Sequence, residues 1–115
     1  MPDKNAKKFK KERERLQELM LSYAGRDMKR FIAIDHQTYL EGALPQRTKE
    51  LLGLVASLVL RCDDCINYHV QQCKSQGVST EELVETLTVG LVVGGSITIP
   101  HIRRALDTWD ELVKE

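Results

Sequence analysis

Two cysteines and a histidine stand close together in the segment LRCDDCINYHV, residues 60–70. Cys65 follows Cys62 by three residues and His69 follows Cys65 by four, so on an α-helix the three side chains share one stripe. Such a set can act as a redox-active thiol pair with its own base, hold part of a metal site, or simply pack. The spacing alone leaves the three interpretations open, because cysteines often fill core space as small apolar residues.

A helix that begins near the first cysteine would favour thiol chemistry. The break in the apolar pattern just before the pair predicts such a start, which places both thiols where unpaired N–H groups and the helix dipole stabilise a thiolate. Asp63 and Asp64 oppose this effect, because their negative charges disfavour a further anion nearby. Since His69 lies at i+4 from Cys65, an imidazole would activate Cys65, and Cys62 would be the second thiol that closes a disulfide.

Cys73 extends the pattern to C-x2-C-x3-H-x3-C and supports the metal interpretation. Four ligands on one helix cannot converge, since a rise of about 1.5 Å per residue sets Cys62 and Cys73 roughly 16 Å apart, whereas zinc binds sulfur at about 2.3 Å. A metal would take two or three of these residues and borrow the others from elsewhere. We interpret Cys73 as a small buried apolar residue, and we expect no resident metal or cofactor.

The composition predicts one soluble globular domain over residues 1–115, with a charged extension at residues 1–15. The net charge of zero gives no electrostatic drive towards nucleic acid or an acidic membrane. The longest apolar run, LLGLVASLVL, has ten residues and is too short to span a bilayer. The charged N-terminus differs from a secretory signal, and three cysteines, an odd number, fit a reducing cytoplasm better than a secreted disulfide framework.

The elements that must position the cysteines are predicted to be six helices with no sheet, because apolar residues recur at helical spacing and no segment alternates. Asp27 is expected to cap the second helix, and Ser79 with Glu82 forms a capping box. Pro100 falls in the first turn of the last helix. The first expected helix ends near Gly25, and the second begins after Asp27. The third spans about 46–60, and the fourth runs to about 76. The fifth ends at 94–95, and the sixth begins near Thr98.

Two of these helices are interpreted as apolar all round, with apolar faces drawn from residues 51–60 and 84–93. A chain of this length has too small a core to enclose both helices by itself. We therefore expect a homo-oligomer that covers these faces.

Glu50 completes a longer pattern, E-x11-C-x2-C-x3-H, with Cys62, Cys65 and His69. The pattern resembles the active-site signature of the alkylhydroperoxidase D (AhpD)-like branch of the carboxymuconolactone decarboxylase family. The resemblance covers roughly residues 28–110, including the Leu-Pro before the signature, the Gly-Val after its helix and the Gly-Gly further on. It implies an all-helical fold, and short chains of this kind in the family associate as homo-oligomers, often trimers or hexamers.

The resemblance also implies roles for these residues. Cys65 corresponds to the cysteine that a hydroperoxide attacks and that becomes a sulfenic acid, and Cys62 corresponds to its proton donor and disulfide partner. Glu50 and His69 correspond to the proton relay, and a dithiol or protein reductant restores the thiols. AhpD itself has a histidine directly before the second cysteine where this chain has Asp64, and we expect the acidic residue to raise the pKa of the thiol.

Two other functions compete with this thiol oxidoreductase. One is a non-catalytic helical oligomer whose cysteine pair senses oxidants or holds zinc for a partner. The other is a lyase like the decarboxylase branch of the family, but that branch generally lacks the cysteine pair, so the resemblance disfavours it.

Contact between Glu50 and His69 requires the chain to reverse just before Cys62. On a straight helix Glu50 would lie about 18 Å before Cys62, whereas an antiparallel hairpin would set it level with Cys73. A crossing angle must then bring it one turn back to His69. The other interpretation of Glu50 is a surface carboxylate in the first turn of its helix, where it would balance the dipole.

Three further residues have mainly structural interpretations. His36 is expected at the boundary of the core, and His101 is expected to pack in the first turn of the last helix. Trp109 is interpreted as an anchor in the core or at an interface.

Overall fold

The computed structural model describes residues 5–115, and residues 1–4 of the charged extension lie outside the described residues. The described chain contains no strand, so the predicted all-helical fold is confirmed. None of the helices in residues 5–115 has the length and apolar character that crossing a membrane requires. The elements are α1 (Asn5–Tyr23), α2 (Arg26–Thr38), α3 (Gln46–Val59), α4 (Asp63–Ser75), α5 (Thr80–Gly94), a 3-10 turn η1 (Ser96–Thr98) and α6 (Ile99–Val113).

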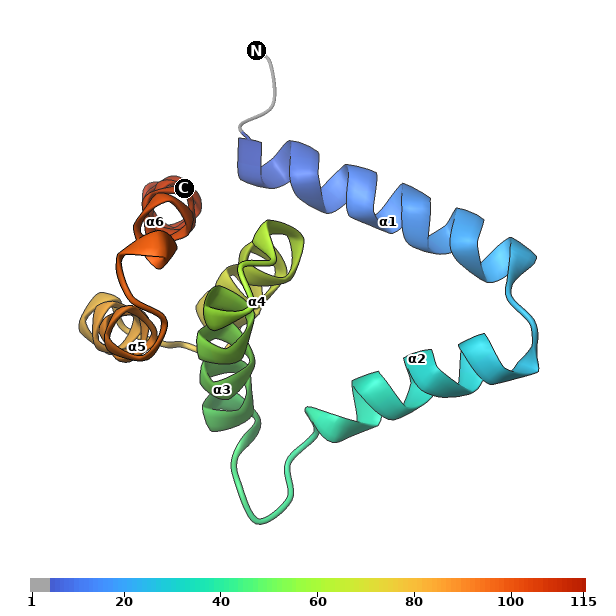
Figure 1. Cartoon of the computed structure of the whole chain (residues 1–115). Helices are drawn as coiled ribbons and strands as arrows, with labels where there is room; N and C mark the ends of the chain where they lie inside the picture. Colours follow the sequence, from blue (N-terminus) through green and yellow to red (C-terminus); the bar gives the residue numbers. More distant parts are fainter. Residues whose placement is uncertain (1–4) are drawn as a thin grey trace.

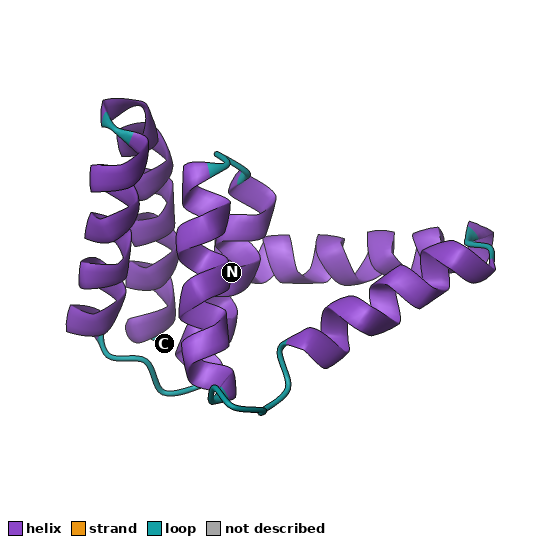
Figure 2. Cartoon of the chain, turned by 60° about the horizontal axis from the view of Figure 1, so that its bottom comes forward, coloured by secondary structure: helices purple, strands orange, loops and turns teal. Residues whose placement is uncertain are grey.

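The last four helices form a bundle, and the first two form an arm that projects from it (Figures 1 and 2). Helix α3 packs against α4 and α5, and α4 packs against α6. The arm, residues 5–38, is anchored at its N-terminal end, where the backbone N–H of Ala6 donates to Glu111 Oε2 at 2.7 Å. Gln71 of α4 also donates to the carbonyl of Ala6 at 3.3 Å, and Ala6 is buried.

The bundle encloses one apolar core to which all four helices contribute. Trp109 of α6 is 4% exposed and its indole N–H donates to Thr80 Oγ1 at 3.0 Å, so it is a core anchor. Cys73 is fully buried in the same core, which confirms its predicted apolar role. The remaining buried members of the core are Leu54, Leu58, Ile66, Val70, Val78, Leu83, Leu87 and Ala105.

Local signals in the sequence predicted most helix boundaries correctly. The capping box of α5 is present, with Glu82 N–H donating to Ser79 Oγ at 3.1 Å and Ser79 N–H donating to Glu82 Oε1 at 2.8 Å. The prediction that Asp27 caps α2 was wrong. Gly25 is the N-cap, and Asp27 lies inside the first turn, where its carboxylate pairs with Arg26 at 3.3 Å.

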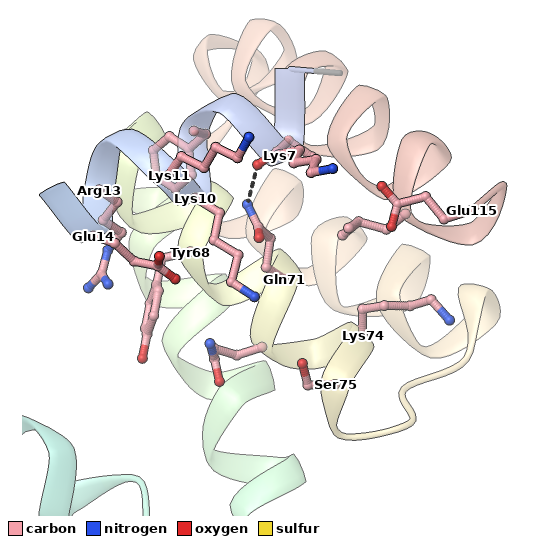
Figure 3. Close-up of a pocket in the computed structure, with 14 residues that line it drawn as sticks. Lys7, Lys10, Lys11, Arg13, Glu14, Tyr68, Gln71, Lys74, Ser75 and Glu115 are labelled. Atoms are coloured by element: carbon pink, nitrogen blue, oxygen red, sulfur yellow. Dashed lines mark hydrogen bonds between the residues drawn. The ribbon is translucent and has the colours of Figure 1, made fainter. Parts of the chain in front are cut away.

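Helix α1 runs past α4, and residues of the two helices line an open cavity of about 880 Å³ (Figure 3). The C-terminal residues Leu112 and Glu115 contribute to its far end. The arm thus forms one wall of a cavity whose other wall belongs to the helix that begins at the cysteine pair.

Candidate thiol site

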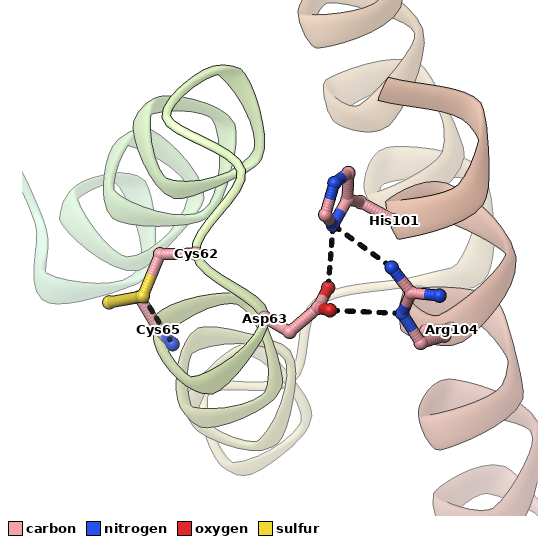
Figure 4. Close-up of polar contacts among 5 residues, drawn as sticks. All are labelled: Cys62, Asp63, Cys65, His101 and Arg104. Carbon is pink, nitrogen blue, oxygen red and sulfur yellow. Dashed lines mark hydrogen bonds and ion pairs between the residues drawn. A yellow bond between two sulfur atoms is a disulfide. The ribbon is translucent and has the colours of Figure 1, made fainter. Parts of the chain in front are cut away.

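The cysteine pair lies at the turn between α3 and α4, where the chain reverses direction. Arg61 has φ +60°, a left-handed conformation that costs a residue with a side chain about 1–2 kcal/mol. Cys62 is the N-cap of α4, and its Sγ accepts the backbone N–H of Cys65 at 3.3 Å. The two sulfurs are joined as a disulfide, with the Cα atoms 5.3 Å apart (Figure 4). Both residues therefore lie at the N-terminal end of a helix, as predicted.

The reversal brings Glu50 of α3 against His69 of α4. Glu50 Oε2 lies 2.9 Å from His69 Nδ1, and the two residues are only 2% and 7% exposed. The interpretation of Glu50 as a surface carboxylate was wrong, because its side chain is enclosed between the helices. A buried carboxylate needs a partner to offset its lost hydration, and the imidazole supplies one.

Gly53 allows this approach of the two helices. A Cβ atom at Gly53 would lie 2.6 Å from Cε1 and 2.8 Å from Nε2 of His69, so the ring of His69 occupies the space that a side chain would fill. The sequence analysis did not identify Gly53. The feature of the sequence that could have pointed to it is a glycine in the interior of a helix. Such a glycine costs roughly 1 kcal/mol relative to alanine and often has a packing reason.

The other side of the imidazole faces a small pocket of about 210 Å³ that Cys65 also lines. The hydroxyl of Tyr39 lies 3.4 Å from His69 Nε2, and the ring of Tyr68 contacts the imidazole edge-on with centroids 5.2 Å apart. Cys65 is exposed, whereas Cys62 is half-buried. The pocket therefore combines an accessible sulfur, an imidazole backed by a carboxylate, and a phenol.

Both phenols of this pocket have raised pKa values. Burial is the main cause for Tyr39, followed by the negative charges of Asp35 and Glu50. Burial also raises the pKa of Tyr68, again with help from the carboxylates, while the guanidinium of Arg13, which lies 4.0 Å from the centre of its ring, acts in the opposite direction. The two hydroxyls hence stay protonated at neutral pH and can donate hydrogen bonds. The sequence analysis did not identify Tyr39 or its contact with His69.

Asp63, between the cysteines, is held by two basic side chains of α6 (Figure 4). His101 Nδ1 lies 2.7 Å from Asp63 Oδ1, and Arg104 Nε lies 3.0 Å from Asp63 Oδ2. His101 was expected to pack in the first turn of α6; it lies in that turn, but its ring binds the start of α4. The guanidinium offsets the negative charge of Asp63, so Asp63 opposes a thiolate less than the sequence predicted. Asp64, by contrast, lines the thiol pocket.

Cys73 takes no part in this arrangement. Burial raises the pKa of its thiol to about 12, with a further contribution from the nearby charge of Glu50. Within residues 5–115, no three His, Cys, Asp or Glu side chains are grouped so that they could hold a metal ion. Of the four residues in the signature, the structure brings Glu50 onto His69 and places His69 and Cys65 in one pocket.

The chain belongs to the carboxymuconolactone decarboxylase family, whose family model matches residues 28–108. The expected family is therefore confirmed. An uncharacterised protein from the cox locus of Paracoccus denitrificans is 29% identical over 82 residues, which cover 71% of this chain and 74% of that relative.

Two crystal structures of a Thermotoga maritima protein resemble this fold closely. One superposes with a TM-score of 0.92 at 52% sequence identity and covers 94% of this chain and 95% of that one. The other has a TM-score of 0.89 at 50% identity, with coverages of 93% and 91%. The second is described as a carboxymuconolactone decarboxylase family protein with a suggested involvement in antioxidative response.

Proposed function

We propose that this protein is an AhpD-like thiol oxidoreductase that reduces hydroperoxides through a Cys62–Cys65 dithiol in an antioxidant role. The observation that most supports the proposal is the buried Glu50–His69 pair, whose imidazole shares a pocket with the exposed Cys65. The disulfide between the cysteines supports a pair that can cycle. The suggested antioxidative involvement of the Thermotoga maritima relative points in the same direction.

In this proposal His69 is the base that activates Cys65. Because Glu50 lies 2.9 Å from Nδ1, that nitrogen carries the proton and Nε2 can accept another. The carboxylate then stabilises the imidazolium that forms when the Cys65 thiol loses its proton. Tyr39, 3.4 Å from Nε2, orients the ring from the pocket side.

The reaction balances with two thiols for each hydroperoxide. The Cys65 thiolate attacks the terminal peroxide oxygen, the O–O bond breaks, and Cys65 becomes a sulfenic acid while the alkoxide takes the proton of Cys62 and leaves as an alcohol. The Cys62 thiolate then attacks the Cys65 sulfur, and the departing hydroxide takes the proton held by His69 to give water. A small dithiol or a dithiol protein returns two electrons and two protons to the disulfide.

The thiol pair needs a reducing compartment to be regenerated, and we propose the cytoplasm as the site of action. Dithiol reductants are available there, and a close thiol pair can pass repeatedly through its oxidised state. We also propose a homo-oligomer as the functional form, because large apolar side chains such as Phe31 and Val92 are exposed in the single chain.

The test is a steady-state assay of hydroperoxide consumption with several dithiol donors, run on the protein prepared without added zinc. We expect turnover by the unaltered protein and none by Cys62→Ser or Cys65→Ser. Equal turnover by Cys65→Ser would contradict the proposal. Absence of turnover with every donor, together with stoichiometric zinc and unreactive thiols, would favour the zinc-holding alternative instead.

A further inference from the structure

The cavity between α1 and α4 is four times the volume of the thiol pocket, about 880 Å³ against about 210 Å³. Such a volume is in the range of sites that hold a drug-sized ligand. Tyr68 and Arg13 line both spaces, so the cavity and the thiol pocket adjoin at these two side chains. A molecule in the cavity could therefore extend past Tyr68 to Cys65.

More basic than acidic residues line the cavity, although the net charge of the chain is zero. Lys10 points from α1 into the cavity (Figure 3), and Lys74 lies on the opposite wall in α4. A concave site with charge of one sign attracts and concentrates ligands of the opposite sign. The charged residues that line it are five basic ones, Lys7, Lys10, Lys11, Arg13 and Lys74, and two acidic ones, Glu14 and Glu115.

The cavity also offers apolar surface. Phe9 of α1, Leu112 near the C-terminus and the ring of Tyr68 line it. The aliphatic stems of the lysines add to this surface while their ammonium groups stay solvated. A ligand that satisfies both features has an anionic head and an apolar chain.

The length of α4 sets how far the reactive group of such a ligand must lie from its anionic head. Ser75, at the far side of the cavity, follows Cys65 by ten residues in α4, which sets them about 15 Å apart along the helix axis. Single carbon–carbon bonds are about 1.5 Å long, so an extended chain advances roughly 1.25 Å per bond. A hydroperoxide about twelve bonds from the anionic head would then reach the sulfur.

We propose that the α1–α4 cavity binds a long-chain fatty acid hydroperoxide, with its carboxylate at Lys10 and Lys74 and its peroxide delivered past Tyr68 to Cys65. This inference rests on the proposed function and names its substrate class. The products are the corresponding hydroxy fatty acid, one water molecule and the Cys62–Cys65 disulfide, and a dithiol donor regenerates the thiols. A small neutral hydroperoxide reacts at the same sulfur without using the cavity.

The test compares three hydroperoxides in stopped-flow oxidation of the reduced protein, each below its micelle concentration. They are linoleic acid hydroperoxide, its methyl ester, and cumene hydroperoxide. We expect the free acid to react about tenfold faster than the ester, since two lysines each add a modest charge interaction at a partly exposed site. Added salt should reduce this preference, because screening weakens exposed charge pairs.

The variant Lys10→Gln/Lys74→Gln should lose the preference for the acid and keep the rate with cumene hydroperoxide. The matched control is Lys8→Gln/Lys29→Gln, which removes two exposed lysines that do not line the cavity and should behave as the unaltered protein. Equal rates for acid and ester in the unaltered protein would overturn the inference while leaving the proposed function intact. Failure of all three hydroperoxides would overturn the proposed function and the delivery step together.

A binding measurement tests the carboxylate site in the cavity independently of the proposed peroxidase activity. Calorimetry with linoleate and the redox-silent Cys62→Ser/Cys65→Ser protein requires no chemistry at the thiols. We expect binding that weakens about tenfold when Lys10 and Lys74 are also changed to Gln. Undetectable binding, or binding that these changes leave unaltered, would contradict a carboxylate site in the cavity.

Discussion

His69 is held on both sides of its ring, by the buried carboxylate of Glu50 at one nitrogen and by the hydroxyl of Tyr39 at the other. This arrangement fixes the tautomer and aims Nε2 at the pocket that Cys65 lines. We therefore expect the reactivity of Cys65 to depend on Glu50, although Glu50 is buried and does not contact the substrate.

Glu50→Gln tests this dependence. The amide can still hydrogen-bond to the imidazole, but it carries no negative charge to favour the imidazolium, so His69 becomes a poorer base. General base assistance is typically worth ~10²–10⁴ in rate, and we expect peroxide-driven oxidation of Cys65 to slow at least tenfold with the fold intact. Stopped-flow oxidation of the reduced protein measures the rate. Glu85→Gln, an exposed carboxylate on α5, is the control, and an equal rate in both variants would reject the relay.

Cys73 gives a second prediction at this scale. Its thiol pKa of about 12 lies above the value of about 8.5 for an unfolded cysteine. The folded state keeps this proton at a pH where the unfolded chain loses it, so the free energy of unfolding falls as pH rises above about 8.5. Cys73→Val keeps the core filled and has no thiol to titrate. Between pH 8 and pH 9.5, its free energy of unfolding should therefore fall by about 1 kcal/mol less than that of the unaltered protein. Urea unfolding at the two pH values measures this, and parallel profiles for both proteins would contradict it.

The thiol pair and its histidine could be predicted from the sequence because their spacing is local. Glu50 could be linked to them only through a family resemblance, since eleven residues and a chain reversal separate it from Cys62. The contacts of Tyr39 with His69 and of Asp63 with His101 join residues of different helices. No local spacing predicts such contacts.

At the scale of elements, the site depends on the close crossing of α3 and α4. The helix ends were predictable, because a capping box and a left-handed glycine act within a few residues. The close crossing of α3 and α4 could not be predicted, because it follows from packing across the hairpin and from the small size of Gly53. Arg61 in a left-handed conformation also gave no signal, since glycine is the usual residue there.

Gly53→Ala separates helix stability from site geometry. Alanine favours the helix interior by roughly 1 kcal/mol, which offsets part of the cost of displacing the ring of His69. Overpacking a core typically costs about 1–3 kcal/mol, so we expect the free energy of unfolding to fall by about 1–2 kcal/mol, together with at least tenfold slower oxidation of Cys65. Thermal unfolding and stopped-flow oxidation measure the two effects.

Gly90→Ala is the matched control for this experiment. A Cβ atom at Gly90 would lie 2.6 Å from Cδ2 of Leu58, a similar clash between α5 and α3 that does not involve His69. It should lower stability and leave the oxidation rate of the folded protein unchanged. Equal reactivity of Gly53→Ala and Gly90→Ala would show that Gly53 does not position the imidazole.

At the scale of the whole molecule, the chain leaves much apolar surface uncovered. On the arm, Phe31 is 73% exposed and Ile34 is 61% exposed, and α2 has no buried residue. On the bundle, Leu60 at the end of α3 and Val92 of α5 are 78% and 80% exposed. Exposed apolar surface of this extent is typical of interaction sites, and we propose that further copies of the chain cover it in a trimer or hexamer.

Light scattering tests this assembly. We expect a mass of three or six chains of 13.1 kDa at micromolar concentration. Phe31→Glu and Val92→Glu place a charge in the proposed interfaces and should shift the mass towards the monomer. Lys29→Glu on α2 and Glu85→Lys on α5 change exposed charged residues on the same helices and should leave the mass unaltered. A stable monomer for the unaltered protein would exclude the oligomer.

The most direct test of the central claim is to identify the sulfur that a hydroperoxide oxidises. Reduced Cys62→Ser protein is treated with one equivalent of cumene hydroperoxide in the presence of dimedone, and the modified residue is located by tandem mass spectrometry. Because Cys62 is absent, a sulfenic acid at Cys65 cannot close the disulfide and is trapped. We predict a dimedone adduct on Cys65 and little or none on Cys62 in the reciprocal Cys65→Ser protein. An adduct on Cys62 of Cys65→Ser that forms faster than the adduct on Cys65 of Cys62→Ser would contradict the account.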